Sequence, residues 1–193
     1  MKQNFCFIVL LFTTTICFSQ SLESLKTETK NLYDANYTMD FEGVVALTYP
    51  KVVATIGKDT MLDTLDLDYQ NLEYRMRLVL PNPIFKFGEI KKVEGKVFCV
   101  IQYKNPVRFT LEKKSDVTSI EKKLIVFKEI SKANKITYEP KRNSFYAERT
   151  SFFIAVSDAT TNQKWKFFNL DDANQNRIFQ NLFGINTKKE LGL

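Results

Sequence analysis

The segment Phe145–Leu170 constrains the fold of this 193-residue chain more than any other. It contains two apolar runs, Thr150–Val156 and Lys164–Leu170, joined by the polar, turn-forming run Asp158–Gln163. In the first run apolar residues occupy both faces of an extended chain, which is typical of a strand that is covered on both sides. The pattern therefore predicts a β-hairpin inside a sheet. A hairpin this apolar is stable only when other elements cover it.

The amino-terminal part of the chain has the helical spacing of apolar residues. Helices are expected over Ser21–Tyr37, Met39–Tyr49 and Lys58–Leu67. Asp40 is a suitable cap for the second helix, and Pro50 is expected to end it. The short apolar run Lys51–Ile56 is compatible with either a helix or a strand.

From Leu72 onward the apolar period changes to two, which is typical of strands. Strands are expected over Leu72–Leu80, Ile84–Val93, Val97–Tyr103, Val107–Leu111 and Lys135–Glu139. Pro81-Asn82-Pro83 is expected to turn the chain between the first two, and Glu94-Gly95 to form a hairpin turn. Asn105-Pro106 interrupts a long apolar run, and we expect a bulge there.

Two further helices are predicted among and after these strands. One spans residues 118–134, where Thr118 and Glu121 have the spacing of a capping box. Its buried face is expected to contain Ile120, Leu124, Phe127 and Ile130. The last helix, Ala173–Phe183, is expected to begin at Asp172 and to end at Gly184. Helices followed by strands that bend around them define an α+β fold.

Met1–Ser19 has the pattern of a secretory signal peptide, because a positive charge precedes an apolar run that ends in small residues. We expect cleavage after Ser19 and an exported protein, periplasmic or secreted. Acylation at Cys17, as in a lipoprotein, is disfavoured by the bulky Ile16 before it. Residues 20–193 are then expected to form a single domain. No later apolar run is long enough for a transmembrane segment.

Several kinds of chemistry lack their usual residues. The chain has no histidine, which is the commonest general base and a common metal ligand. Cys99 is the only cysteine after the signal peptide, so no intramolecular disulfide is expected, and its apolar neighbours indicate a buried hydrophobe. Four aspartates in the third helix indicate a solvated face rather than a metal site, since their spacing does not match a calcium loop. They are Asp59, Asp63, Asp66 and Asp68. We therefore assign no catalytic residue, no metal and no cofactor.

Charge is distributed unevenly along the chain. Ser21–Phe85 contains 6 basic and 10 acidic residues, whereas Lys86–Arg142 contains 15 basic and 7 acidic residues. The basic side chains of this middle region do not form a compact motif, and glutamates lie between them. We interpret them as solvated surface and expect no nucleic-acid partner.

Three segments taken together resemble a known superfamily: Tyr37–Leu62, Phe153–Asp158 and Lys164–Asn169. They are similar to the nuclear transport factor and ketosteroid isomerase superfamily, in particular to its small secreted members in Gram-negative bacteria. The resemblance implies a cone-shaped, cystatin-like roll, in which amino-terminal helices pack in the concave face of a curved antiparallel sheet. It also implies a cavity at the wide end. The helix at residues 118–134 is an insertion relative to the minimal cone.

The resemblance directs attention to polar aromatic and charged side chains that could line the cavity. The candidate binding residues are Tyr37, Asp40, Tyr49, Tyr74, Tyr103, Arg108 and Trp165. The alternative is that the aromatic residues belong to the core and that the charges form surface pairs. No catalytic residue is carried over from the superfamily, since its dehydratases rely on histidines and the aspartate and tyrosine of its isomerases have no matching positions here.

Three hypotheses for function follow. The first is a non-catalytic binding module of the cell envelope, for a small apolar ligand or a partner protein. The second is an enzyme similar to an isomerase or lyase, with Asp or Glu and Tyr as acid and base; it requires a carboxylate beside a tyrosine hydroxyl in an open cavity. The third is a structural subunit that forms homodimers through its sheet face.

Overall fold

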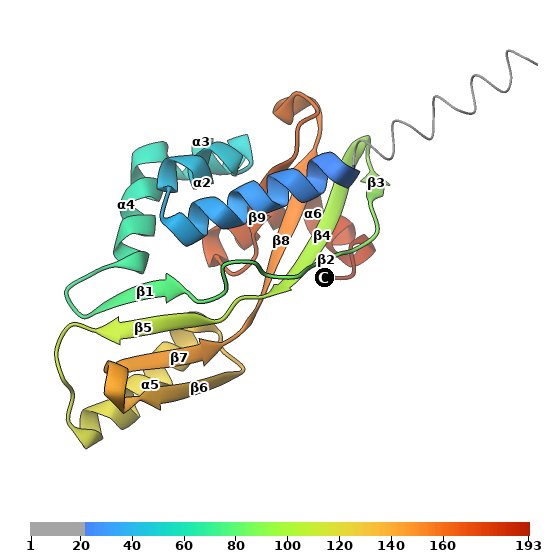
Figure 1. Cartoon of the computed structure of the whole chain (residues 1–193). Coiled ribbons are helices and arrows are strands. Elements are labelled where there is room, and N and C mark those ends of the chain that lie inside the picture. The colour runs from blue at the N-terminus through green and yellow to red at the C-terminus, as the bar shows by residue number, and fades with distance from the viewer. Residues whose placement is uncertain (1–21) are drawn as a thin grey trace, which may run out of the picture.

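The computed structural model describes residues 22–193, which form an α+β structure of helices and antiparallel sheets (Figure 1). The predicted signal peptide, Met1–Ser19, lies outside the described residues. The helices are the first helix (residues 22–38), α2 (Phe41–Leu47), α3 (Pro50–Ile56), α4 (Lys58–Tyr69), α5 (Val117–Ser131) and α6 (Ala173–Glu190). The strands are β1 (Tyr74–Leu78), β2 (Phe85–Phe87), β3 (Lys91–Val93), β4 (Lys96–Lys104), β5 (Val107–Leu111), β6 (Lys135–Glu139), β7 (Ser144–Glu148), β8 (Thr150–Ser157) and β9 (Lys166–Asn169).

The strands form two sheets. Both sheets contain part of one long two-stranded ribbon, in which β4 and β5 pair with β8 and β7. The first sheet has the order β1-β5-β7-β6, and the second has the order β2-β4-β8-β9, with β3 also paired to β4. Figure 1 shows that β4 continues into β5 and that β7 continues into β8, so these strands run through both sheets. The ribbon bends where the first sheet meets the second.

The bend at Asn105-Pro106 does not contain the predicted bulge. Lys104 lies opposite Thr150 and Val107 lies opposite Ala147, so both strands advance by the same number of residues across the bend. The backbone N–H of Asn105 still donates to the Arg149 carbonyl oxygen at 2.9 Å. The prediction of a bulge is wrong. Pro106 interrupts the hydrogen-bond ladder because it has no N–H, and the loss of this donor does not require an extra residue in the strand.

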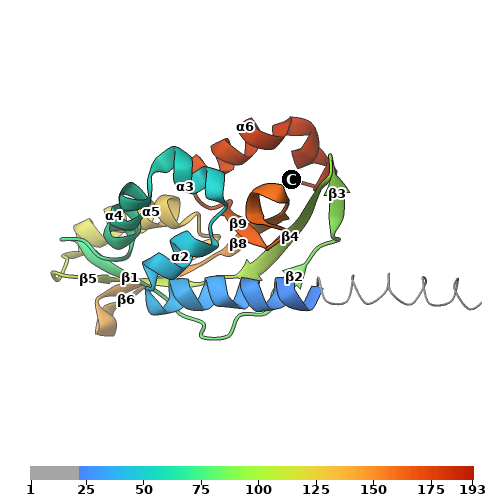
Figure 2. The same ribbon diagram turned by 90° about the horizontal axis from the view of Figure 1, so that it is seen from above.

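Helices cover both faces of the second sheet, as the apolar pattern of the hairpin predicts. Figure 2 shows the first helix on one side of β4 and β8 and α6 on the other. Phe153 and Ala155 belong to the core beneath the first helix, whereas Ile154 and Val156 belong to the core beneath α6. Successive residues of β8 point to opposite faces, and each face meets an apolar layer.

The connection after β1 differs from the prediction. Ile84–Val93 does not form one strand paired with β1; it forms two short strands, β2 and β3, that both pair with β4. Strand β1 instead pairs with β5, across from Phe109 and its neighbours. Two prolines in Pro81-Asn82-Pro83 lack the N–H that a tight hairpin ladder needs, and the chain crosses here from one sheet to the other. The predicted Glu94-Gly95 turn is confirmed, with positive φ at both residues.

Most of the predicted helix ends are confirmed. The Asp40 side chain accepts from Gly43 N, and Asp172 caps α6 by accepting from Asn174 N. Gly184, at φ 76°, interrupts α6, and a further helical segment follows it. Pro50 does not simply end a helix: it is the first residue of α3, a position where its missing N–H costs nothing. The ambiguous run Lys51–Ile56 is therefore helical.

The start of α5 and part of its inner face were predicted incorrectly. Asp116, rather than Thr118, is the N-cap, and its side chain accepts from Ser119 N. A carboxylate binds the free N–H groups of a first turn better than a threonine hydroxyl does. Phe127 is buried, but Ile130 is 55% exposed. Helix α5 covers only the end of the first sheet, so the apolar face of the helix is only partly buried.

Cys99 is fully buried in β4, which confirms the prediction of a buried hydrophobe. Burial raises the pKa of its thiol to about 11. Since the thiolate is the reactive form, we expect the native protein to react with Ellman's reagent at pH 8 about a hundredfold more slowly than the urea-unfolded protein. Equal rates in the two states would contradict this burial.

Candidate functional site

A cavity of about 380 Å³ lies where the two sheets meet. Its walls come from α4, β1 and β5, the end of α5, the bend of the ribbon, and the segment that leads from β9 into α6. These elements are far apart in the sequence. They come together because the helices pack over the bent ribbon, and the cavity is therefore a product of the tertiary fold.

The apolar wall of the cavity is built on β1. Tyr74, Met76 and Leu78 alternate along this strand, so they share one face, and all three line the cavity. Phe109 lies opposite Met76 on β5 and continues the wall. Behind it, the Phe127 ring of α5 stacks on Phe109 with 4.7 Å between ring centroids.

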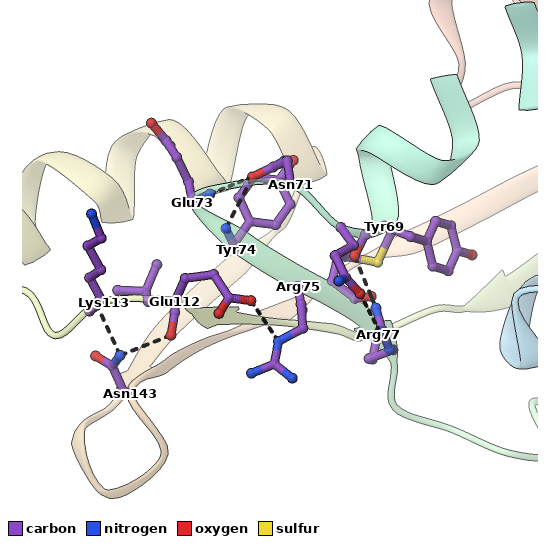
Figure 3. A network of polar contacts seen from close by, with 12 residues as sticks. Tyr69, Asn71, Glu73, Tyr74, Arg75, Arg77, Glu112, Lys113 and Asn143 are labelled. Atoms are coloured by element: carbon purple, nitrogen blue, oxygen red, sulfur yellow. Dashed lines mark hydrogen bonds and ion pairs between the residues drawn. The ribbon is translucent and has the colours of Figure 1, made fainter. Parts of the chain in front are cut away.

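A polar network fixes the turn between α4 and β1 (Figure 3). The Arg77 guanidinium donates to the carbonyl oxygens of Tyr69, at 3.0 Å, and Met76, at 2.7 Å. The Asn71 side chain accepts from the backbone N–H groups of Glu73 and Tyr74. These bonds join the carboxyl end of α4 to β1, and they hold Tyr69 and Tyr74 in the cavity wall.

Two buried polar side chains of the ribbon also line the cavity. Tyr103 and Asn105 are 4% and 3% exposed and lie two residues apart. The Asn105 amide nitrogen donates to Ser151 Oγ at 3.0 Å, but its Oδ1 is buried without a hydrogen-bond partner. In the part of the chain that the structure describes, no hydrogen bond is formed by the Tyr103 hydroxyl either. Burial raises the pKa of Tyr103 well above its usual range, so this hydroxyl stays protonated.

Charged side chains stand around these groups. Asp172 is engaged as the cap of α6, whereas Asp68 and Asp171 have side chains that form no ion pair or hydrogen bond within residues 22–193. Partial desolvation by the surrounding residues, and then the nearby Asp172 carboxylate, raise the pKa of Asp68. Among the described residues that line the cavity, Arg149 is the only basic one, and its Nε donates to the Asn105 carbonyl at 3.1 Å. It makes no ion pair with a carboxylate of the described residues.

Of the residues proposed from sequence, Tyr74 and Tyr103 lie in the cavity wall. Tyr49 and Trp165 are core residues instead, 1% and 4% exposed. The Tyr49 hydroxyl donates to Asp158 Oδ2 at 2.7 Å, and the ring stacks on Phe168 in the core beneath α6. This pair is a buried carboxylate beside a tyrosine hydroxyl. Its hydrogen bond joins two loops, and the pair does not face the cavity.

The other three proposed residues have separate surroundings. Tyr37 is 37% exposed and stacks against Tyr33 of the first helix. Asp40 serves as the cap of α2. Arg108 lies on β5, where its Nε donates to Glu139 at 2.8 Å, and this ion pair lowers the pKa of Glu139. Of these three, only Arg108 forms the surface pair that the alternative describes, and none of the three lines the cavity.

Sequence reasoning missed Asn105, Arg149 and Asp171 as possible site residues. In the sequence, Asn105 is typical of a turn and Asp171 precedes a helix cap. Arg149 is the single residue between two strands. No spacing in the sequence relates the three, because only the bend of the ribbon and the entry to α6 bring them to one cavity. Asp68 was interpreted as part of a solvated face. It is indeed exposed, but it stands at the edge of the cavity.

In comparisons with known proteins, no family model, curated protein or solved structure matches the chain. Within residues 22–193 no group of His, Cys, Asp and Glu side chains is arranged to hold a metal ion. In the same range, no helix has the length and apolar character needed to cross a membrane.

Proposed function

We propose that this chain is a non-catalytic binding module, and that a small molecule occupies the cavity at the bend of the ribbon. The observation that carries the proposal is a buried polar atom without a hydrogen-bond partner among the described residues, Asn105 Oδ1, in a cavity with an apolar wall. An unpartnered buried polar atom costs about 1–3 kcal/mol, which a ligand could offset by hydrogen bonding. Small-molecule sites commonly combine an apolar wall with a few placed polar groups.

The layout supports two related proposals. Helices that precede a bent antiparallel ribbon, with a cavity between them, fit the cone-shaped superfamily that the sequence resembles. The Met1–Ser19 pattern supports export, and it favours a ligand of the cell envelope. The polar groups argue for an amphipathic ligand rather than the purely apolar one expected from the sequence.

The binding proposal can be tested with 2-phenylethanol as a probe, observed by NMR chemical shifts. We expect shifts at Tyr103, Asn105 and Met76, and we expect Leu65→Trp to abolish them by filling the cavity. Leu67→Trp is the matched control, since Leu67 is on the same helix but 61% exposed and outside the cavity. Shifts that persist in Leu65→Trp, or that cluster elsewhere, would contradict the proposal.

A second candidate, an enzyme similar to an isomerase or lyase, is favoured by Asp68. This carboxylate has a raised pKa and lines the same cavity as three tyrosines, Tyr69, Tyr74 and Tyr103. Such a carboxylate could remove a proton next to a carbonyl while a tyrosine donates to the oxygen. The test is deuterium exchange at the α-carbon of 2-tetralone. Catalysed exchange that is lost in Asp68→Asn would support this candidate, and exchange at the buffer rate would exclude it for this probe.

A further inference from the structure

We propose that the cavity binds an organic cation, a molecule with an ammonium or substituted ammonium group on an apolar body. This inference rests on the proposed binding function and names the class of ligand. It follows from the charge of the cavity, from the kind of polar group left without a partner, and from the aromatic wall.

The charge of the lining favours a cation. Among the described residues, three aspartates line the cavity, Asp68, Asp171 and Asp172, with a single arginine, Arg149, which gives the lining a formal net charge of −2; the Lys132 ammonium lies outside the lining and donates to the Asp171 carbonyl oxygen at 2.7 Å. Arg149 does not neutralise them, since it forms no ion pair within the described residues and its Nε is held by the Asn105 carbonyl. It also lines a groove at the bend, together with Lys104 and Glu148, so its charge is shared between two surfaces.

The unpartnered groups are mainly acceptors. Asn105 Oδ1 is a buried acceptor without a donor, and the carboxylates of Asp68 and Asp171 accept nothing from the rest of residues 22–193. An ammonium group supplies up to three donors and no acceptor, so it complements this set. A carboxylate or phosphate ligand would bring more acceptors and more negative charge to the same place.

The aromatic wall suits the same ligand. Tyr74 and Tyr103 line the cavity together with Phe109 and Phe153, and their rings offer apolar surface to the body of the ligand. Tyrosine and phenylalanine rings also attract a cation that lies over their faces. A volume of about 380 Å³ accommodates a molecule of one or two rings.

The test uses three probes of similar size and shape that differ in charge: 2-phenylethylammonium, 2-phenylethanol and 3-phenylpropanoate. Their dissociation constants are measured by isothermal titration calorimetry on the protein at pH 7. We expect the ammonium probe to bind at least about tenfold more tightly than the alcohol, and the anion to bind most weakly.

Variants distinguish the effect of charge on probe binding from the effect of shape. Asp171→Asn and Asp68→Asn should each weaken the ammonium probe by about three- to tenfold and leave the alcohol unchanged. Asp66→Asn is the matched control, because Asp66 is an exposed aspartate of α4 that does not line the cavity. It should change none of the three constants, and a loss of ammonium binding in this variant equal to that in Asp171→Asn would overturn the inference.

The possible results distinguish this inference from the function on which it rests. If the alcohol or the anion binds as tightly as the ammonium probe, and Leu65→Trp abolishes that binding, the cavity is a binding site but its preference for cations is refuted. If none of the three probes binds, both proposals fail. If only the ammonium probe binds tightly and the two aspartate variants weaken it, both are supported.

Discussion

Replacement of Phe127 by alanine should lower the free energy of unfolding by about 3–5 kcal/mol, the usual cost of removing a fully buried aromatic ring. Phe127 is 2% exposed, and it is the anchor of α5 on the first sheet. Its ring stacks on Phe109 and lies edge-to-face against Tyr74 at 5.2 Å. Phe145 contacts it at 5.0 Å. An alanine at this position would leave a void among three aromatic rings.

The same change should also weaken binding in the cavity, because α5 contributes Ile130 and Ser131 to its wall. Urea unfolding followed by circular dichroism gives the change in stability. Val126→Ala is the matched control: Val126 precedes Phe127 on α5, is 48% exposed, and should cost less than about 0.5 kcal/mol. Comparable losses in the two variants would show that α5 does not pack as described.

Asp158→Ala should be the second most damaging change, with a loss of about 2–4 kcal/mol. Asp158 is 5% exposed. One carboxylate oxygen accepts from the Tyr49 hydroxyl at 2.7 Å and the other from Thr161 N at 3.1 Å. The variant therefore leaves a buried hydroxyl without its acceptor and removes the cap of the turn between β8 and β9.

Two comparison variants apportion this loss. Tyr49→Phe removes only the hydroxyl and should cost about 1–2 kcal/mol. Asp63→Ala removes an exposed aspartate of α4 and should stay within about 0.5 kcal/mol of the parent. Thermal unfolding by calorimetry at neutral pH measures all three. A loss for Asp158→Ala no larger than that for Asp63→Ala would contradict the buried network.

Local patterns in the sequence were sufficient for most elements. The two apolar faces of Thr150–Val156 predicted a covered strand, and the structure places a core on each side of it. Asp40, Asp172 and Gly184 marked helix ends because capping depends on residues close in sequence. The prediction that Cys99 is buried is confirmed for the same reason, since its neighbours in the sequence are apolar on both sides.

Long-range pairing could not be read in the same way. Leu72–Leu80 and Ile84–Val93 were expected to be consecutive partners, but the prolines between them carry the chain to the other sheet. The cavity depends on that pairing, since β1 supplies its apolar wall from one sheet, Tyr103 lines it from the other, and Asn105 lines it from the bend between them. Tyr49 and Trp165 were proposed for a cavity on the strength of residue type, and type alone does not distinguish a core aromatic from a cavity aromatic.

The central claim is that the cavity at the ribbon bend receives a cationic ligand, and a crystal structure of the protein with 2-phenylethylammonium tests it most directly. We expect the ammonium nitrogen to lie within hydrogen-bonding distance of the Asp68 or Asp171 carboxylate, and the ring to lie against the wall formed by Tyr74 and Phe109. A cavity filled by the protein's own side chains, or the probe bound at another place, would contradict it.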